Sequence, residues 1–505
     1  MKKTFYISTP IYYVNGLPHI GHSYTTIAAD CLSRHKRARG YDVFFLTGTD
    51  EHGQKVLKAA EEKGLSPREF VDGIIPRFKE MWNKLDITND DFIRTTEERH
   101  IKAVQYFLQA LYDKGDIYQG EYEGLYCVPC EVFWTQKQAI GDLCPDCKRP
   151  VDKIKESNYF FKISAYQDWL LQYIKDHSDF ICPDSRRNEV LVFLEENKLN
   201  DLCISRPRAR MSWGISLPFS PDHVTYVWFD ALINYVSALG FPQDKAKFEK
   251  SKFEKSKFEK FWPVAIHLIG KDILRQHAIF WPIILKAAGL EPPRMVFAHG
   301  WWQVGSEKMS KSLGNVINPL DVIDEFGIDV YRYFLLREVP FGLDGVFSKK
   351  SLIKRFNGDL ANDLGNLIYR TLTMAEKYFS GRIPGFDAAS CDAFAREKIL
   401  PKIDTLATGV DESLDRFDFI SALSSIWELV GVCNKYIEET KPWALKKQNK
   451  IKEIENFIAV LIKAIRAVAL ELTPFMPQTA SRIMSQIKSD HVEKSEPLFP
   501  RIIPA

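Results

Sequence analysis

The chain has 505 residues, of which 45% are hydrophobic, and its 68 lysines and arginines balance 66 aspartates and glutamates. This length suits two to four domains with a substantial core. The net charge of +2 excludes a strongly basic body, so contact with a nucleic acid must rely on local groups. The amino terminus lacks a long apolar run, and the apolar stretch 457–475 contains charged residues. We therefore expect a cytoplasmic protein without a membrane segment.

The amino-terminal part alternates strand-like and helix-like segments. Residues 4–8 and 43–46 are short apolar runs, and residues 23–39 and 55–63 have helical periodicity, each closed by a glycine. This alternation predicts an α/β fold with a Rossmann-like, doubly wound parallel sheet. The alternation stops near Gly115 and resumes in the apolar stretches 227–238 and 265–269. An insertion inside a discontinuous sheet explains both changes.

Beyond residue 351 the strand signal fades and long helical periodicities predict an α-helical bundle. We expect five segments. They are the first half of the sheet domain at 1–115, a connective insertion at 116–225, the second half of the sheet domain at 226–305, a loop and connecting region at 306–350, and the helical domain at 351–505.

The sequence His19-Ile20-Gly21-His22 follows the first expected strand, where the first helix begins. Ligands of open α/β sheets bind beyond the carboxyl ends of the strands, and a helix amino terminus there attracts phosphate. Gly21 lets a planar ring approach the backbone, and His19 and His22 can donate hydrogen bonds to phosphate oxygens. By itself this short motif is more often structural.

A second motif, Lys-Met-Ser-Lys-Ser, spans residues 308–312. Lys308 and Lys311, with small hydroxyl residues between them, suit a mobile loop that brings cations onto a triphosphate. Such a charge run alone is typical of a solvated surface. The presence of both motifs in one chain favours a site for a nucleotide.

Four of the nine cysteines form two Cys-x-x-Cys pairs, Cys127 with Cys130 and Cys144 with Cys147. Two such turns, separated by about a dozen residues, present four thiolates in the closed tetrahedral arrangement of structural zinc. Since four protein ligands leave no position for water, we expect Zn²⁺ here without a catalytic role. Four packed cysteines without metal are the alternative.

A Lys/Phe/Glu repeat with a period of five covers residues 247–260. A basic helix that binds a partner is one interpretation. Five-residue spacing does not keep the phenylalanines on one helical face, so a tandem expansion of a surface loop is favoured.

The two signature motifs resemble those of class I aminoacyl-tRNA synthetases. The sequences Gly-Thr-Asp-Glu-His-Gly at 48–53, Val-Trp-Phe-Asp-Ala at 227–231 and Gly-Lys-Asp-Ile at 270–273 are similar to the methionyl-tRNA synthetase family, of the bacterial type with one four-cysteine zinc knuckle. The similarity covers the chain except for the repeat. It implies a methionine–tRNA ligase that makes methionyl-adenylate from L-methionine and ATP, releases pyrophosphate, and transfers the methionyl group to the 3′-terminal adenosine of tRNA(Met), including initiator tRNA.

The resemblance also implies roles for individual residues. It makes His19, His22, Lys308 and Lys311 catalytic, and it assigns ATP, with its Mg²⁺ ion, to His19, Gly21, His22, Asp272 and Lys311. Methionine needs an anion for its ammonium group and an aromatic-lined slot for its thioether. By position, the resemblance makes the following residues the methionine-binding ones: Ile11, Tyr13, Asp50, Trp228, Ala231, Leu232, Tyr235, Ile273, His277 and Trp281. Gln276 stands where family members can carry an aromatic residue, which leaves the closure of the pocket open.

Asn366 and Arg370 are four residues apart in a helical stretch and therefore share a face. Trp443 alone would be a buried anchor. By resemblance the three match the family's anticodon-binding residues, in which a ring stacks on an unpaired base and polar groups contact base edges. The resemblance thus makes 306–350 the loop of the second motif and 351–505 the anticodon-binding domain.

Two alternatives remain open. A sister synthetase for leucine, isoleucine or valine would need a large editing insertion, and the interval between His19 and Lys308 has no room for it. An idle tRNA-binding or zinc-ribbon protein would need neither signature motif. Some family members append a dimerising domain after the helical bundle; the chain ends soon after Arg501, and a monomer is expected.

Overall fold

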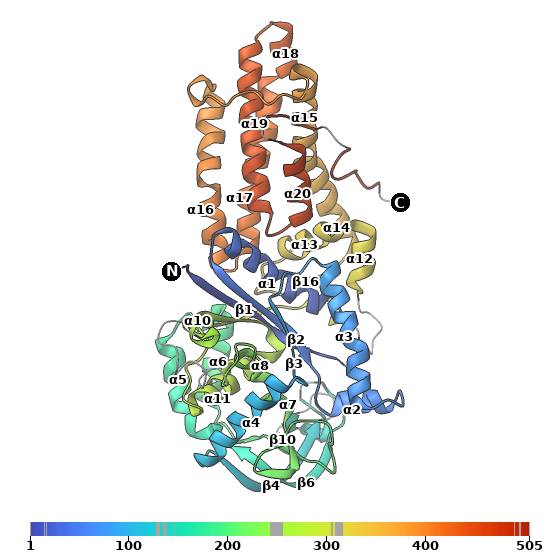
Figure 1. Cartoon of the computed structure of the whole chain (residues 1–505), viewed down its shortest axis with the longest axis vertical. Helices are drawn as coiled ribbons and strands as arrows, with labels where there is room; N and C mark the ends of the chain where they lie inside the picture. The colour runs from blue at the N-terminus through green and yellow to red at the C-terminus, as the bar shows by residue number, and fades with distance from the viewer. Residues whose placement is uncertain are drawn as a thin grey trace. The chain divides into compact units, whose positions relative to one another are not determined.

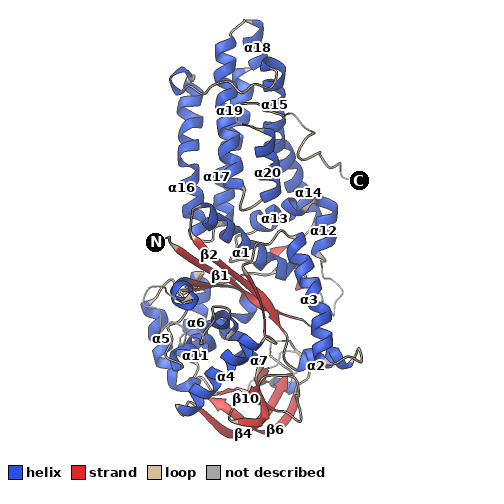
Figure 2. Ribbon diagram, viewed as in Figure 1, coloured by secondary structure: helices blue, strands red, loops and turns tan. Residues whose placement is uncertain are grey.

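The computed structural model of the chain describes residues 2–503 except 15, 17, 128–131, 135–138, 146, 243–255, 305–306, 309–316, 489 and 494–495. The chain divides into two compact units, Met1–His299 and Gly300–Ala505. Figure 1 colours them by residue number and Figure 2 by secondary structure. Each unit buries apolar side chains of its own, such as Phe45 in the first and Leu461 in the second.

A six-stranded sheet forms the centre of the first unit. Its strands lie in the order β3-β2-β1-β12-β13-β7, and every neighbouring pair is parallel. The strands are β1 Thr4–Tyr13, β2 Asp42–Asp50, β3 Asp91–Arg94, β7 Ile181–Cys182, β12 Ala265–Gly270 and β13 Met295–His299. β1 is buried along most of its length, as a sheet covered by helices on both faces requires. The predicted Rossmann-like fold is confirmed.

Helices provide the crossovers between the parallel strands. Helix α1, Ile20–Ala38, connects β1 to β2, and helices α2, Gln54–Glu61, and α3, Pro67–Lys84, connect β2 to β3. α1 begins three residues before its predicted start because His19 caps it, and it ends before Gly40, whose φ is +78°. A left-handed residue at this place is the usual end of a helix.

The segment after α4, Glu98–Asp113, forms the predicted insertion. The chain turns at Gly115, with φ of +79°, into an antiparallel sheet of order β5-β4-β6-β8. A smaller sheet of order β10-β11-β9 and two helices follow. The elements are β4 Ile117–Cys127, β5 Val132–Trp134, β6 Asp152–Phe161, α5 Gln167–Asp176, α6 Asp184–Glu196, β8 Leu202–Cys203, β9 Ser205–Pro207, β10 Ser216–Leu217 and β11 Ser220–Thr225.

Two features differ from the simplest form of the expected organisation. Strand β7 lies within segment 116–225, yet it pairs with β13 at the edge of the central sheet, so the insertion contributes to that sheet. The apolar stretch after Tyr226 forms helices α7, Val227–Leu232, and α8, Asn234–Ser237. Side chains there are buried almost all round, and such a segment has no periodicity to separate helix from strand.

The last copy of the Lys/Phe/Glu repeat forms helix α10, Lys257–Phe261. Ser256 and Glu259 form a capping box at its start, and Phe258 packs against Trp262 with ring centroids 5.8 Å apart. This copy is therefore part of the packed fold and not a surface loop. Residues 247–255 lie outside the described residues.

The second unit is mainly helical, as predicted. It begins with short strands in the order β15-β14-β16, and its long helices α15, α16, α17 and α19 pack on one another. A π-helical segment, Phe356–Gly365, leads directly into α15. The elements are β14 Trp302–Val304, β15 Glu307–Lys308, α12 Pro319–Phe326, α13 Ile328–Arg337, β16 Gly345–Val346, α14 Lys349–Arg355, α15 Asn366–Phe379, α16 Leu400–Asp415, α17 Phe419–Thr440, α18 Pro442–Lys447, α19 Ile451–Leu472 and α20 Pro477–Gln486.

Among the described helices, none is both long enough and apolar enough to cross a membrane.

Candidate active site

The strand order of the central sheet changes direction between β1 and β12. The chain proceeds from β1 to β2 and β3 on one side, and to β12 and β13 on the other. At such a switch point the connections after the two central strands diverge, and ligands bind at the carboxyl edge. β1 leads to His19 and β12 leads to Asp272. The structure therefore places residues from two distant sequence motifs at one edge.

His19 and His22 cap the first turn of α1. Nδ1 of His19 accepts a hydrogen bond from the backbone N–H of Gly21 at 3.1 Å, and Nδ1 of His22 accepts one from the N–H of His19 at 3.3 Å. The two rings stack with centroids 3.9 Å apart. A neutral imidazole that accepts at Nδ1 carries its proton on Nε2. The caps thus set one tautomer for both rings and make each Nε2 a donor.

Two glycines allow close approaches at this edge. A Cβ on Gly21 would lie 3.0 Å from Cε1 of His19, and a Cβ on Gly270 would lie 2.6 Å from Oδ1 of Asp272. Gly270 also lies near His299, whose Nε2 is 2.7 Å from Oγ1 of Thr25 on α1. These contacts connect the end of β12 to the first turns of α1.

The residues assigned to methionine come from four parts of the first unit. Ile11 and Tyr13 are on β1 and Asp50 ends β2; Trp228, Ala231 and Leu232 are on α7 and Tyr235 is on α8; Ile273, His277 and Trp281 follow β12. The structure brings Tyr235 and His277 together, with Oη 2.7 Å from Nε2. It also packs Tyr235 against Trp281, with centroids 6.0 Å apart. The carboxylate of Asp50 is buried, with the residue only 3% exposed.

Hydrogen bonds determine the protonation of His277. Its Nδ1 lies 2.9 Å from the carbonyl oxygen of Ile273, which only accepts, so Nδ1 carries the proton and Nε2 accepts from the hydroxyl of Tyr235. Burial lowers the pKa of His277 to about 4. The ring is therefore neutral at pH 7, and it offers the candidate pocket a polar but uncharged wall.

Sequence reasoning missed a second buried histidine beside this pair. His267, on β12, stacks on Tyr235 with centroids 3.9 Å apart and accepts a hydrogen bond from Nε1 of Trp281 at 3.1 Å. Its Nδ1 lies 2.8 Å from Oγ of Ser8. Burial lowers its pKa well below the usual value, with a smaller effect from His277. A single histidine in an apolar strand had given no signal of these contacts.

A buried cluster of His52, Asp230 and His100 was also missed. Oδ2 of Asp230 lies 2.7 Å from Nδ1 of His52, and Oδ1 lies 2.7 Å from Nε2 of His100. Although burial opposes ionisation, the two histidines keep the pKa of Asp230 below its usual value. His52 follows Asp50 closely in the chain, and Asp230 precedes Ala231. The cluster therefore connects two segments that carry candidate methionine-binding residues.

Gln276 lies in a π-helical turn, Gln276–Phe280, that precedes α11, Trp281–Ala287. Its Oε1 is buried and has no hydrogen-bond partner among the described residues. Lys308 lies on β15, paired in register with Gln303, and its side chain is not described. Lys311 lies outside the described residues.

Three of the four predicted zinc ligands are described, and they come together. The Sγ atoms of Cys127, Cys144 and Cys147 lie within 4.8 Å of one another, and those of Cys127 and Cys147 are 3.5 Å apart. Tetrahedral zinc with Zn–S bonds of about 2.3 Å needs sulfur separations of about 3.8 Å, so the cluster fits such an ion. Cys130 lies outside the described residues.

The candidate anticodon residues lie in the second unit. Asn366 and Arg370 are on α15, and Nη1 of Arg370 forms an ion pair with Glu438 of α17 at 2.6 Å. Trp443 is on α18, a few residues beyond Glu438, and 46% of it is exposed. Arg370 is thus joined to the end of α17 that leads to Trp443. The exposure of Trp443 does not fit a buried anchor.

Known proteins are similar to this chain over nearly its whole length. The family model "tRNA synthetases class I (M)" matches residues 5–372, and "Anticodon-binding domain of tRNA ligase" matches residues 396–504. The methionine–tRNA ligase of Caldanaerobacter subterraneus subsp. tengcongensis is 49% identical over 522 residues, which cover 99% of this chain and 79% of that protein. The ligase of Thermotoga maritima is 46% identical over 499 residues, which cover 98% and 77%.

Solved structures agree as well. Methionyl-tRNA synthetase of Mycobacterium tuberculosis in complex with methionyl-adenylate matches with a TM-score of 0.92 and 38% identity, over 99% of this chain and 100% of that one. Its apo form matches with a TM-score of 0.86 and 35% identity. A discontinuous parallel sheet with an insertion, followed in the chain by a helical anticodon-binding domain, defines a class I aminoacyl-tRNA synthetase.

Within that class, the family model and the relatives agree on one amino acid. The chain belongs to the methionyl-tRNA synthetase family. Its activity is that of a methionine–tRNA ligase.

Proposed function

We propose that the chain activates L-methionine with ATP and transfers it to the 3′-terminal adenosine of tRNA(Met), including initiator tRNA. The observation that supports the proposal is that His19 and His22 follow β1 and Asp272 follows β12, the two neighbouring strands at the switch point of the sheet. His299, which pairs in register with Gly270 at the end of β12, lies within hydrogen-bond distance of Thr25 on α1 and so links the two segments.

In the first step a carboxylate oxygen of methionine attacks the α-phosphorus of ATP. The bond from that phosphorus to the bridging oxygen breaks, and pyrophosphate leaves with the electron pair. The nucleophile is already an anion, so no side-chain base is needed; the site must orient two anions and stabilise charge on the phosphate. Nε2–H groups of His19 and His22 donate to the phosphates, Asp272 accepts from the ribose hydroxyls, and Gly21 leaves room for the nucleotide.

Lys308 and Lys311 contribute two further cations, which stabilise the negative charge of the triphosphate. A Mg²⁺ ion that arrives with ATP neutralises part of the phosphate charge when it is bound. In the second step the terminal ribose hydroxyl attacks the carbonyl carbon of the adenylate. The ester forms, the bond to the phosphate oxygen breaks, and AMP leaves with the electron pair while the hydroxyl proton passes to its departing phosphate.

Methionine lies against residues from β1, α7, α8 and the segment after β12. Asp50 pairs with its ammonium group, while the aromatic and aliphatic residues surround the thioether. The neutral ring of His277 suits this role because a charged wall would disfavour an uncharged sulfur. The hydroxyl of Tyr235 is held by His277 at 2.7 Å and so has a defined direction.

Cys127, Cys130, Cys144 and Cys147 would hold Zn²⁺, which would fix the fold of the insertion. Asn366, Arg370 and Trp443 read the anticodon of the tRNA. The domain boundaries at 115, 225, 305 and 350, a monomeric state and a location in the cytoplasm, where tRNA charging supplies translation, belong to the same proposal.

Amino-acid-dependent exchange of pyrophosphate into ATP, measured with each of the twenty amino acids in turn, tests the proposal. We expect methionine to support exchange far better than any other amino acid, and charging to be confined to tRNA(Met). Preferential exchange with another amino acid would refute it.

A further inference from the structure

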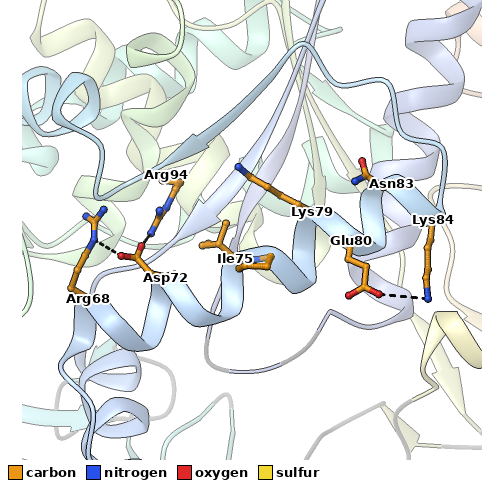
Figure 3. A pocket seen from close by; sticks show the side chains of 9 residues that line it. Arg68, Asp72, Ile75, Lys79, Glu80, Asn83, Lys84 and Arg94 are labelled. Carbon is orange, nitrogen blue, oxygen red and sulfur yellow. Dashed lines mark hydrogen bonds and ion pairs between the residues drawn. The ribbon is translucent and has the colours of Figure 1, made fainter.

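A long groove runs along the exposed side of α3 in the first unit. Its volume is about 810 Å³, and it is wide open to solvent. Figure 3 shows the side chains that line it, among them Arg68, Asp72, Lys79, Lys84 and Arg94. All but Arg94 come from α3; Arg94 ends β3, the edge strand of the central sheet. The groove thus follows the open edge of the sheet.

The groove carries an excess of positive charge. Asp72 pairs with both Arg68 and Arg94, and Glu80 pairs weakly with Lys84 at 3.6 Å. Lys79 pairs with no carboxylate among the described residues. Its Nζ lies instead 5.2 Å from the ring centroid of Phe92, a half-buried aromatic residue on β3. Lys79 is therefore a cation beside an aromatic face.

Contacts on the opposite side of α3 connect it to the candidate active site. Phe78 lies 6.0 Å from the ring of His22, and Trp82 lies 5.6 Å from that of Tyr12, centroid to centroid. The same helix therefore supports the histidine motif with one face and lines the groove with the other.

The groove also begins at the edge where Asp50 lies. Arg94 donates to both carboxylate oxygens of Glu51, at 2.6 and 2.9 Å, and Glu51 follows Asp50 in the chain. Because α3 crosses back between parallel strands, its Arg68 end meets this carboxyl edge and its Lys84 end lies away from it. An 18-residue helix is about 27 Å long. The groove is thus a path that leads away from the candidate site.

A ligand for this path needs negative charges at intervals that match its cations. Single-stranded nucleic acid carries such charges along its backbone, and the proteins that bind it follow that backbone with basic grooves. The reaction requires the terminal ribose of tRNA at the candidate site, so the preceding nucleotides must leave that site along the surface.

We propose that this groove, the α3 groove, binds the single-stranded 3′ end of the tRNA, and that Lys79 contacts a backbone phosphate. The proposal rests on the proposed function, because it concerns the path of that reaction's RNA substrate. Phe92, beneath Lys79, supports this side chain from outside the groove, and Arg68 and Lys84 line the groove as cations that are each paired with a carboxylate.

The test compares Lys79→Gln with a matched control, Lys63→Gln. Nζ of Lys63 also lies 5.2 Å from an aromatic centroid, that of Phe70, but Lys63 does not line the groove. We expect Lys79→Gln to raise the KM for tRNA about fivefold to tenfold and to lower the slope of log affinity against log salt by about 0.7, the loss of one phosphate contact with a single strand. Methionine-dependent pyrophosphate exchange should not change. Equal effects of the two variants, or an unchanged KM for tRNA, would overturn the proposal.

A second arm separates the single-stranded end from the rest of the tRNA. Binding is measured with tRNA that lacks its last four nucleotides. We expect Lys79→Gln to weaken binding of intact tRNA but not of the shortened tRNA. A loss that persists with shortened tRNA would assign the groove to the double-stranded stem and refute the proposal. Failure of the proposed function is distinct, because wild-type protein would then show no methionine-dependent exchange.

Discussion

The imidazole rings of His19 and His22 stack with centroids 3.9 Å apart, and each ring accepts a hydrogen bond from a backbone N–H at the first turn of α1. Both rings accept these hydrogen bonds at Nδ1, so each neutral ring carries its proton on Nε2, which the caps do not use. Capping therefore leaves Nε2 of both rings for the phosphate binding that we propose. A change that turns either ring should impair activation of methionine without unfolding the helix.

Gly21→Ala makes that change. Alanine is favoured over glycine in a helix by about 0.5–1 kcal/mol, so folding should not suffer. The new Cβ would lie 3.0 Å from Cε1 of His19, and the ring must move. We expect pyrophosphate exchange to fall at least tenfold, with an unchanged or higher Tm. Gly73→Ala on α3, where a Cβ would meet nothing within 4 Å, is the control and should keep full activity. Full activity of Gly21→Ala would contradict the role of the capped ring.

Asp230→Asn tests the cluster that connects β2 to α7. An asparagine has one acceptor oxygen, so it cannot accept from both His52 and His100. With the link to His52 weakened, α7 should lose its position relative to Asp50. We expect the KM for methionine to rise about tenfold, with a smaller change in the KM for ATP.

The control for this cluster is His100→Asn, which removes the link to α4 but keeps the pair of His52 and Asp230. We expect it to lower the Tm and to leave the KM for methionine nearly unchanged. If the two variants shift that KM equally, the cluster stabilises the fold without positioning α7.

The signature motifs could be predicted from sequence because their residues are neighbours in the chain. His19 and His22 share one helical turn, and Asp272 directly follows a recognisable strand. The cluster around Asp230 could not be found in this way, since its partners are 178 and 130 positions away and nothing local marks them.

The fold was predictable to a similar extent. Alternating apolar runs identified the parallel sheet, but β7 has two residues, which is too short for a periodic signal. Helices α7 and α8 are buried almost all round, so hydrophobic periodicity could not distinguish them from a strand. The pair of Tyr235 and His277 required the tertiary structure, because their contact depends on the packing of α8 on the turn after β12.

The buried ring of His277 predicts how stability depends on pH. Its pKa is about 4 in the folded protein and near 6.5 when unfolded, so the unfolded chain binds more protons between these values. Stability contributed by the neutral ring is complete above pH 6.5 and is lost as the pH falls to 4, by on the order of 3 kcal/mol. We expect His277→Gln to flatten this slope. Chemical denaturation of both proteins at pH 7, 6, 5 and 4.5 measures it, and parallel curves would contradict the assignment.

Cys144→Ser tests the metal site of the insertion. Three described sulfurs lie within 4.8 Å of one another, and loss of one ligand should weaken zinc binding strongly. We expect about one zinc per chain in the wild type, much less in the variant, and a lower Tm. Cys433→Ser, a buried cysteine of α17 outside the cluster, should retain the metal. A metal analysis that finds no zinc in freshly purified wild-type protein would refute the site.

Trp443→Ala separates tRNA recognition from chemistry. The indole is 46% exposed on α18, so its removal opens no buried cavity and should change the Tm little. Stacking of a base on an aromatic ring contributes about 1–3 kcal/mol, which corresponds to a rise of about fivefold to 150-fold in the KM for tRNA. Methionine-dependent pyrophosphate exchange should be unaffected, because it needs no tRNA. Phe386→Ala, which removes another aromatic residue of the same unit with 40% exposure, is the control and should charge tRNA normally. Equal loss of exchange and charging in Trp443→Ala would show that the ring supports the fold instead of reading the anticodon.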